Sequence, residues 1–162
     1  MIKSNIATAG CLVLALSFAG GAALADVWPF RAMAGTWSGG GMLSTADGQQ
    51  ERLRCRASYN VAGAGDELRL SLRCASPSYN FDLASNVEDR GGAISGEWTE
   101  ASRNASGTLE GRAVGDHVEA AARGQNFSAN LSLTTRGNRQ MISIRPQGGG
   151  DIRAVSLELS RR

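Results

Sequence analysis

Apolar and polar residues alternate along the chain from Thr36 to Ser160, and residues typical of turns interrupt this alternation at short intervals. Successive side chains of a β-strand point to opposite faces of a sheet, so a period of two is typical of half-buried antiparallel strands. We count about ten such strands in simple sequential order. Twisted strands in this number close into a barrel or split into two packed sheets, and short turns favour closure. The pattern predicts an all-β fold, an up-and-down antiparallel barrel of about ten strands, with no helix beyond a turn near Trp28 to Met33.

One hairpin carries a second signal besides its hydrophobic pattern. Within the stretch 52–74, apolar residues occupy every second position on both sides of a glycine-rich turn. Folding this hairpin with its apolar residues on one face sets Tyr59 opposite Leu70, and the same register sets Cys55 opposite Cys74. Directly opposed residues on one face have Cβ atoms close enough for a disulfide, so we predict a Cys55–Cys74 disulfide. A metal site needs more ligands than these cysteines and the one histidine supply, and we predict no metal and no cofactor.

The same reasoning gives registers for the neighbouring hairpins. They set Trp37 opposite Tyr59, Leu83 opposite Ile94 about a turn near Glu88-Asp89, Trp98 opposite Leu109, Ala113 opposite Val118 and Leu133 opposite Ile142. In the last strand the apolar phase slips between Ile152 and Val155, which indicates a β-bulge.

The N-terminal residues have the three parts of a secretory signal peptide. Lys3 gives a basic start, a short apolar run follows, and the segment ends in Ala-Leu-Ala at residues 23–25. A membrane span needs about 20 apolar residues, so a retained anchor helix is the weaker alternative. We predict that residues 1–25 are removed on export, that residues 26–162 form a single domain, and that the protein is periplasmic or secreted.

The charge balance and the aromatic content exclude two classes of protein. The chain has 17 Lys and Arg residues against 15 Asp and Glu, a net charge of +2, whereas nucleic-acid binding usually requires a basic stripe. Outer-membrane barrels also have alternating strands, but with aromatic girdles and long loops. This sequence has neither. We therefore expect an apolar interior, no nucleic-acid partner and no membrane-spanning barrel.

The start of the first predicted strand resembles a known family. Gly35-Thr36-Trp37, preceded by the apolar segment 27–30, resembles the Gly-x-Trp start of lipocalins and related calycin barrels. In that family a short helical turn closes the barrel bottom, the tryptophan packs beneath it, and an arginine from a late strand crosses the tryptophan. The resemblance implies those roles for Trp37 and Arg153. Residues 38–41 are similar to the opening strand of nitrobindin-like barrels, which bind haem through a histidine near the C-terminus; this chain has none there, so that resemblance implies shape and not haem.

A second resemblance implies a different partner. Ala34-Gly35-Thr36-Trp37 is similar to the opening of small periplasmic inhibitors of bacterial metalloproteases, which are barrels with one early disulfide. In those proteins the N-terminal arm enters the protease cleft, and residues 26–31 would form that arm here. The resemblance implies a protease as an alternative partner.

The polar residues give little sign of catalysis. His117 lies beside a turn on the polar face, and both cysteines are expected in the disulfide, so the usual pairing of nucleophile and base is missing. Glu97 and Glu110 are predicted to oppose each other, but on a convex face without the cleft that a carboxylate pair needs. We predict that the protein is not an enzyme.

Three arginines share the outer face of the disulfide hairpin: Arg54, Arg56 and Arg73. Arg56 is predicted opposite Arg73, and opposed like charges are destabilising, so a bound anion or a diagonal acid such as Asp82 would help. The arginines predict an anionic partner, either an envelope component or an acidic protein surface. A solvated arginine-rich face is the alternative.

Small residues are frequent at the predicted inward positions, among them Gly39, Gly41, Gly96 and Ala120. Side chains just fill the interior of a barrel of about eight strands, and a barrel of about ten strands encloses more space. The interior therefore either holds a cavity or flattens around a filled core. We predict a ligand cavity lined by Trp37, Tyr59, Leu70, Phe81 and Trp98. The predicted function is an exported protein that binds a small apolar ligand in the barrel interior. A protease-inhibitor-like protein and an envelope-associated structural protein are the alternatives.

Overall fold

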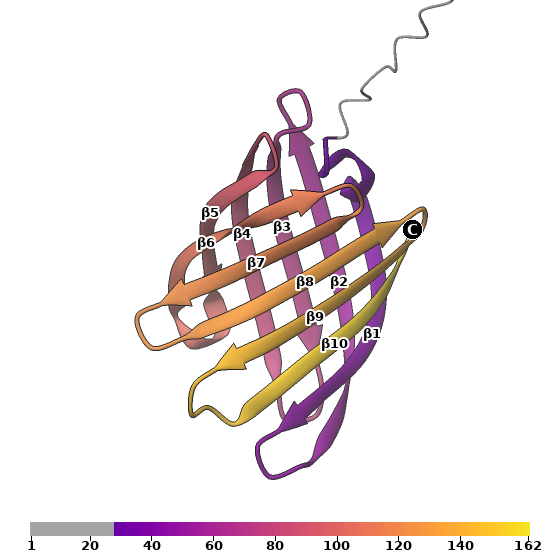
Figure 1. The fold of residues 1–162 in the computed structure, drawn as a ribbon. Coiled ribbons are helices and arrows are strands. Elements are labelled where there is room, and N and C mark those ends of the chain that lie inside the picture. The colour runs from indigo at the N-terminus through magenta and orange to yellow at the C-terminus, as the bar shows by residue number, and fades with distance from the viewer. Residues whose placement is uncertain (1–27) are drawn as a thin grey trace, which may run out of the picture.

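The computed structural model describes residues 28–162, which form a closed antiparallel barrel (Figure 1). Its ten strands are β1 (Gly35–Thr45), β2 (Gln50–Ala62), β3 (Glu67–Ala75), β4 (Asn80–Arg90), β5 (Ala93–Glu100), β6 (Ala105–Val114), β7 (His117–Gly124), β8 (Ser128–Arg136), β9 (Arg139–Gln147) and β10 (Ile152–Arg161). Each strand pairs with its neighbours in sequence, and β10 pairs with β1. Two 3-10 helices, η1 (Arg31–Met33) and η2 (Ala101–Arg103), complete the described part. The predicted fold class is confirmed, whereas the predicted signal peptide lies outside the described residues.

The register of the disulfide hairpin is as predicted. Strands β2 and β3 pair Tyr59 with Leu70 and Cys55 with Cys74, and the two cysteines are joined by a disulfide. The registers of β6 with β7 and of β8 with β9 are also confirmed. The β6–β7 and β8–β9 turns are each two residues long, and so short a turn leaves little freedom for the register of its hairpin.

The predicted bulge is present where β10 meets β1. Ile152 opposes Thr45 while Ala154 opposes Ser44, so Arg153 is the extra residue. The bulge brings Val155 and the later apolar residues of β10 into phase with the interior.

Two of the registers given above differ from the structure by two residues. Trp37 opposes Ala57 instead of Tyr59, and Trp98 opposes Gly107 instead of Leu109. Because side chains alternate along a strand, an even shift leaves every residue on its predicted face. The division into inner and outer faces is therefore correct although the strands slide along one another.

A larger shift separates β4 from β5, where Leu83 opposes Glu100 instead of Ile94. Strand β4 continues past Glu88-Asp89, and the turn forms at the two following glycines, whose φ values of 64° and 89° are left-handed. Glycine adopts this conformation without strain. Asp89 is buried, and its carboxylate accepts a hydrogen bond from the backbone N–H of Gly92 (2.9 Å). The aspartate is an inward residue that supports the next turn.

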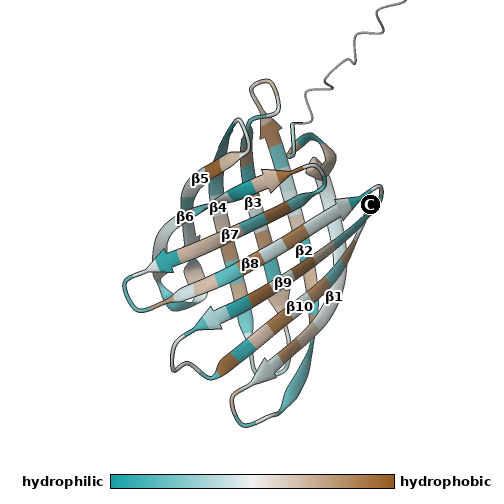
Figure 2. Cartoon of the chain, viewed as in Figure 1, coloured by the Kyte–Doolittle hydropathy of each residue, from teal (hydrophilic) through white to brown (hydrophobic). Residues whose placement is uncertain are grey.

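Apolar side chains point into the barrel and charged side chains cover its outside. Figure 2 shows this alternation as brown and teal bands along the strands. Leu43, Leu53 and Leu159 are at most 1% exposed, whereas the arginines at alternate positions of β2 are exposed. Outer-membrane barrels have the reverse arrangement, with apolar side chains outside. Within residues 28–162, no helix is long and apolar enough to cross a membrane.

Glycines allow neighbouring strands to approach closely where the sheet bends. A Cβ atom on Gly41 would collide with the backbone oxygen of Ser156 in β10, and one on Gly96 would collide with the backbone oxygen of Asn86 in β4. Glycine kinks of this kind let a sheet coil into a closed barrel. Strands β7 to β10 consequently run obliquely across β2 to β4 (Figure 1).

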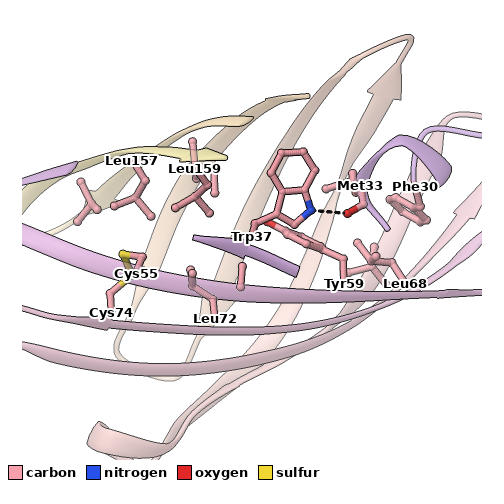
Figure 3. Close-up of a cluster of buried hydrophobic side chains, with 14 of the residues drawn as sticks. Phe30, Met33, Trp37, Cys55, Tyr59, Leu68, Leu72, Cys74, Leu157 and Leu159 are labelled. Atoms are coloured by element: carbon pink, nitrogen blue, oxygen red, sulfur yellow. Dashed lines mark hydrogen bonds between the residues drawn. A yellow bond between two sulfur atoms is a disulfide. The ribbon is translucent and has the colours of Figure 1, made fainter. Parts of the chain in front are cut away.

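Residues 28–34, termed the plug, cover one end of the barrel. Phe30 and Met33 of the plug are 1% and 3% exposed. The indole Nε1 of Trp37 donates a hydrogen bond to the backbone oxygen of Met33 (2.7 Å; Figure 3). Arg31 holds the plug from outside, because its Nε donates to the backbone oxygen of Ala64 in the β2–β3 turn (2.9 Å). The helical turn and the tryptophan beneath it are arranged as the calycin resemblance implies.

The arginine that crosses Trp37 is not the one expected. The guanidinium of Arg161 lies 4.4 Å from the centroid of a Trp37 ring and also donates to backbone oxygens of the plug. Arg153 lies near the start of β10, at the opposite end of that strand from Arg161. The expectation for Arg153 is wrong because the strand continues to Arg161 before it reaches the plug.

Candidate ligand-binding cavity

The barrel interior holds a cavity of about 770 Å³. Phe30 and Met33 of the plug bound it at one end. At the other end it reaches the loops that follow β3, β5, β7 and β9, and residues of these loops line its mouth. Of the two alternatives for the interior, a cavity and a filled, flattened core, the structure has the cavity.

The cavity lining between the plug and the loops is mostly apolar, and the hydroxyl groups of Tyr59 and Ser85 in it are already engaged. Tyr59 Oη donates to Oε1 of Gln140 (2.6 Å), and Nε2 of Gln140 donates to Oγ1 of Thr135 (3.1 Å). Ser85 Oγ donates to the backbone oxygen of Glu97 (2.8 Å). Burial raises the pKa of Tyr59. Tyr59 is therefore a neutral donor.

Aromatic side chains gather towards the mouth. Phe127, 40% exposed, packs edge-on against Trp98 with ring centroids 5.5 Å apart. Tyr79 and Phe81 are stacked, with centroids 6.4 Å apart. All four line the cavity. Pairs of aromatic rings in these geometries are favourable beyond the area they bury, so the rings form an ordered apolar rim.

A carboxylate and a guanidinium lie together at the mouth. Oε1 of Glu100 accepts hydrogen bonds from the backbone N–H groups of Asp82 (2.8 Å) and Ser102 (3.2 Å), and Oε2 lies 3.4 Å from Nη1 of Arg103. Burial raises the pKa of Glu100, but these hydrogen bonds lower it more, and the net pKa is below its usual value. Glu100 is thus an ion whose main partners belong to η2 and β4.

Four of the five residues predicted to line the cavity do so: Tyr59, Leu70, Phe81 and Trp98. Trp37 does not line it. It is fully buried beneath the plug, where it packs edge-on against Tyr59 with ring centroids 6.5 Å apart. Its inward position in β1 was predicted correctly, but its side chain packs against Met33, Tyr59 and Arg161 and does not reach the open space. A ligand-binding role for the other four stays a prediction.

The sequence did not reveal Tyr79, Glu100, Arg103 or Phe127 as residues of the cavity. Tyr79, Arg103 and Phe127 lie outside the strands. The alternation of a strand does not extend to such residues, so it does not predict which way their side chains point. Within residues 28–162, no group of three or more His, Cys, Asp or Glu side chains is placed to hold a metal ion.

The outer arginines lie away from the cavity, on the opposite face of β2 and β3. Arg56 opposes Arg73 as predicted. Asp82 lies directly opposite Arg73 instead of diagonally, and it forms an ion pair with it (3.2 Å). Arg54 stays on the same outer face. Asp82 is therefore the neighbouring acid that was predicted for Arg73. An anionic partner for these arginines stays a prediction.

The other polar residues considered for catalysis, Glu97, Glu110 and His117, lie on the outside of the barrel. Glu97 opposes Thr108 and not Glu110, because β5 and β6 are shifted by two residues. Glu110 instead pairs with Arg123 (3.3 Å). His117 lies on the outer face, where its ring contacts Thr134 (2.9 Å). None of these residues faces the cavity.

Solved structures of other proteins share the fold. Rv2717c from M. tuberculosis matches with a TM-score of 0.65 at 12% identity, over 81% of this chain and 93% of that chain. The S-type phycobiliprotein lyase CPES from Guillardia theta matches with a TM-score of 0.59 at 13% identity, over 82% of this chain and 89% of that chain. No protein-family model matches the chain, and no curated protein is significantly similar to it. The likeness therefore concerns the fold alone, and it is consistent with a lipocalin- or calycin-like barrel.

Proposed function

We propose that this protein is an exported carrier that binds a small apolar molecule inside its barrel. The observation that carries the proposal is the cavity of about 770 Å³ between the plug and the loops at the other end. Binding sites for small molecules are typically clefts or cavities of roughly 300–1,000 Å³, lined mostly by apolar and aromatic side chains. Leucines of β2 to β4 and β8 line most of the depth of this cavity, and aromatic rings its mouth.

Hydroxyl groups inside the cavity are already hydrogen-bonded to the protein, and this favours an apolar ligand. The hydroxyl groups of Tyr59 and Ser85 already donate to protein acceptors. A ligand group that needs a hydrogen-bond donor would lose its hydration there without replacement, which is unfavourable. The depth of the cavity therefore suits hydrocarbon or aromatic groups.

Binding without catalysis is the better interpretation of Glu100, the buried one of the two carboxylates that line the cavity. A general base works best with a pKa near the operating pH. The hydrogen bonds around Glu100 lower its pKa, which makes it a weak base. We therefore propose a carrier and not an enzyme.

Export fits the remaining features. The Cys55–Cys74 disulfide is of the kind that persists in oxidising compartments. One structural neighbour is named as a phycobiliprotein lyase, which is compatible with a barrel of this shape that holds a small molecule. The inhibitor-like alternative has less support, because Phe30 of the predicted arm is packed in the plug and Arg31 is bonded to Ala64.

The proposal is tested with a neutral fluorescent probe, N-phenyl-1-naphthylamine, and two variants of adjacent residues in β7. Ala120 lines the cavity, whereas Ala121 lies on the outer face opposite Glu110. Ala120→Phe should weaken probe binding at least about tenfold, while Ala121→Phe should bind like the wild type. Native mass spectrometry of protein from its own host should show a retained small molecule. Equal binding by both variants, or a wild type that binds no probe, would contradict the proposal.

A further inference from the structure

Any polar group of a bound ligand has to be satisfied at the mouth of the cavity. Tyr59 and Ser85, the hydroxyl groups at depth, are engaged with Gln140 and with the backbone of Glu97. Cys74 is tied in the disulfide. The charged side chains that line the cavity, among the described residues, are Glu100, Arg103 and Asp151, and all three follow or end strands on the side of the mouth.

Arg103 is the only basic side chain among the described residues of this lining. Its guanidinium lies 4.6 Å from the ring centroid of Phe81, which fixes it above the aromatic rim. Nη1 donates to the backbone oxygen of Asn80 (2.9 Å) and contacts Glu100. A guanidinium has five N–H donors, and neither Nε nor Nη2 bonds to a described residue. The side chain is 43% exposed, so these donors are available to a ligand.

Glu100 and Asp151 limit the charge of the group that Arg103 can accept. The Glu100 side chain is 10% exposed and is held mainly by backbone N–H groups, so it positions Arg103 without occupying all of its donors. Asp151 is exposed at the end of the glycine-rich loop after β9. Two carboxylates in a cavity lining that holds one guanidinium would repel a group with several negative charges. A single carboxylate, bound by parallel N–H donors, fits this arrangement.

We infer that the cavity takes amphiphiles with one apolar chain and a carboxylate head, and that Arg103 binds the head at the mouth while the chain extends towards the plug. The inference rests on the proposed function, because it needs a cavity that admits an apolar chain. It adds the class of ligand and the direction in which the ligand lies.

The test compares three probes that share one chain and differ in the head: dodecanoic acid, 1-dodecanol and dodecyltrimethylammonium. The measurement is the displacement of N-phenyl-1-naphthylamine from the folded chain. Each dodecyl compound is added below the concentration at which it forms micelles. The wild type should bind the acid about tenfold more tightly than the alcohol. Arg103→Gln should remove that preference and leave the affinity for the alcohol within about twofold of wild type.

Two control variants separate a direct contact from general effects. Arg145→Gln removes the same charge from the outer face of β9, near the mouth but outside the cavity lining, and it should keep the preference for the acid. Arg103→Lys keeps the charge and should retain part of the preference. Thermal unfolding of each variant identifies any loss of fold.

The outcomes distinguish the two proposals. Binding of all three probes with similar affinity, unchanged by Arg103→Gln, or tighter binding of the ammonium probe, would overturn the role of Arg103 and leave the carrier function intact. A wild type that binds none of the probes would overturn both.

Discussion

The guanidinium of Arg161 stacks on the indole of Trp37 and donates hydrogen bonds to the backbone oxygens of Ala32 and Ala34. Trp37 and Arg161 are also direct partners in the register of β1 with β10. One residue of the last strand therefore joins the first strand to the plug. The closed end of the barrel depends on a contact between the two ends of the described chain.

Arg161→Ala should destabilise the barrel by about 2 kcal/mol, because it removes a cation–π contact and two hydrogen bonds from a charged donor. Arg153→Ala is the matched control on the same strand, where the side chain is exposed, and should stay within about 0.5 kcal/mol of wild type. Urea unfolding followed by tryptophan fluorescence measures both. Equal losses in the two variants would argue against a special role of Arg161.

The interior and exterior of the barrel were predictable because one period governs all the strands. Parity assigns Tyr59, Leu70, Phe81 and Trp98 to the inside without knowledge of the exact register, and an even slip does not change this assignment. Position along the strand is a different matter. Trp37 has the correct parity but lies under the plug, and no period in the sequence reports how far the plug extends.

The mouth could not be predicted from the pattern of the strands. Arg103 and Phe127 lie outside strands, separated by two strands in sequence, and they face the same space only because the sheet closes. The turn after β4 was misplaced for a similar reason. Asp89 is a typical turn residue by type, and its inward position depends on a hydrogen bond with Gly92 that the sequence does not show.

Tyr59→Phe should destabilise the protein by about 1–3 kcal/mol, since it leaves Oε1 of the fully buried Gln140 without a donor. Tyr79→Phe makes the same change where the hydroxyl group has no partner among the described residues, and it should be nearly neutral. Burial raises the pKa of Tyr59 above its usual 10.0, so its stabilising effect is complete below pH 10 and is lost as the pH rises further. Chemical unfolding between pH 8 and about 11 should show a steeper loss for wild type than for Tyr59→Phe.

Reduction of the disulfide should lower stability by about 3 kcal/mol, because the bond closes a loop between cysteines 19 residues apart. Unfolding with and without reductant measures the difference. The double variant Cys55→Ala/Cys74→Ala should not respond to reductant. Alkylation and mass analysis of protein taken from its host without reductant should find no free thiol at these positions. Two alkylated cysteines would contradict both the bond and the oxidising compartment.

Gly41→Ala should destabilise the barrel by about 1–3 kcal/mol or more, because the new Cβ would meet the backbone of Ser156 and Leu157 in β10, which cannot move without breaking the β1–β10 pairing. Gly149→Ala is the matched control in the loop after β9, where a Cβ has nothing within 4 Å. It should change stability by less than about 0.5 kcal/mol. Thermal unfolding of the two variants checks the prediction, and a neutral Gly41→Ala would show that β1 and β10 do not bend together here.

Glu100 should make the protein sensitive to acid. Its folded-state pKa lies below the usual 4.5, so the unfolded chain takes up the proton first. The stabilisation is complete above pH 4.5 and is lost as the pH falls through the folded-state pKa. After screening by solvent this amounts to at most about 1 kcal/mol. Unfolding between pH 6 and about 3 should show a shallower loss of stability for Glu100→Gln than for wild type.

Glu97→Gln is the control, because the Glu97 side chain accepts no hydrogen bond from a described residue, and it should follow the wild-type curve. Glu100→Gln also removes the charged partner of Arg103. If this releases the Arg103 side chain, the preference of the variant for dodecanoic acid over dodecanol should change, although Arg103 keeps its charge.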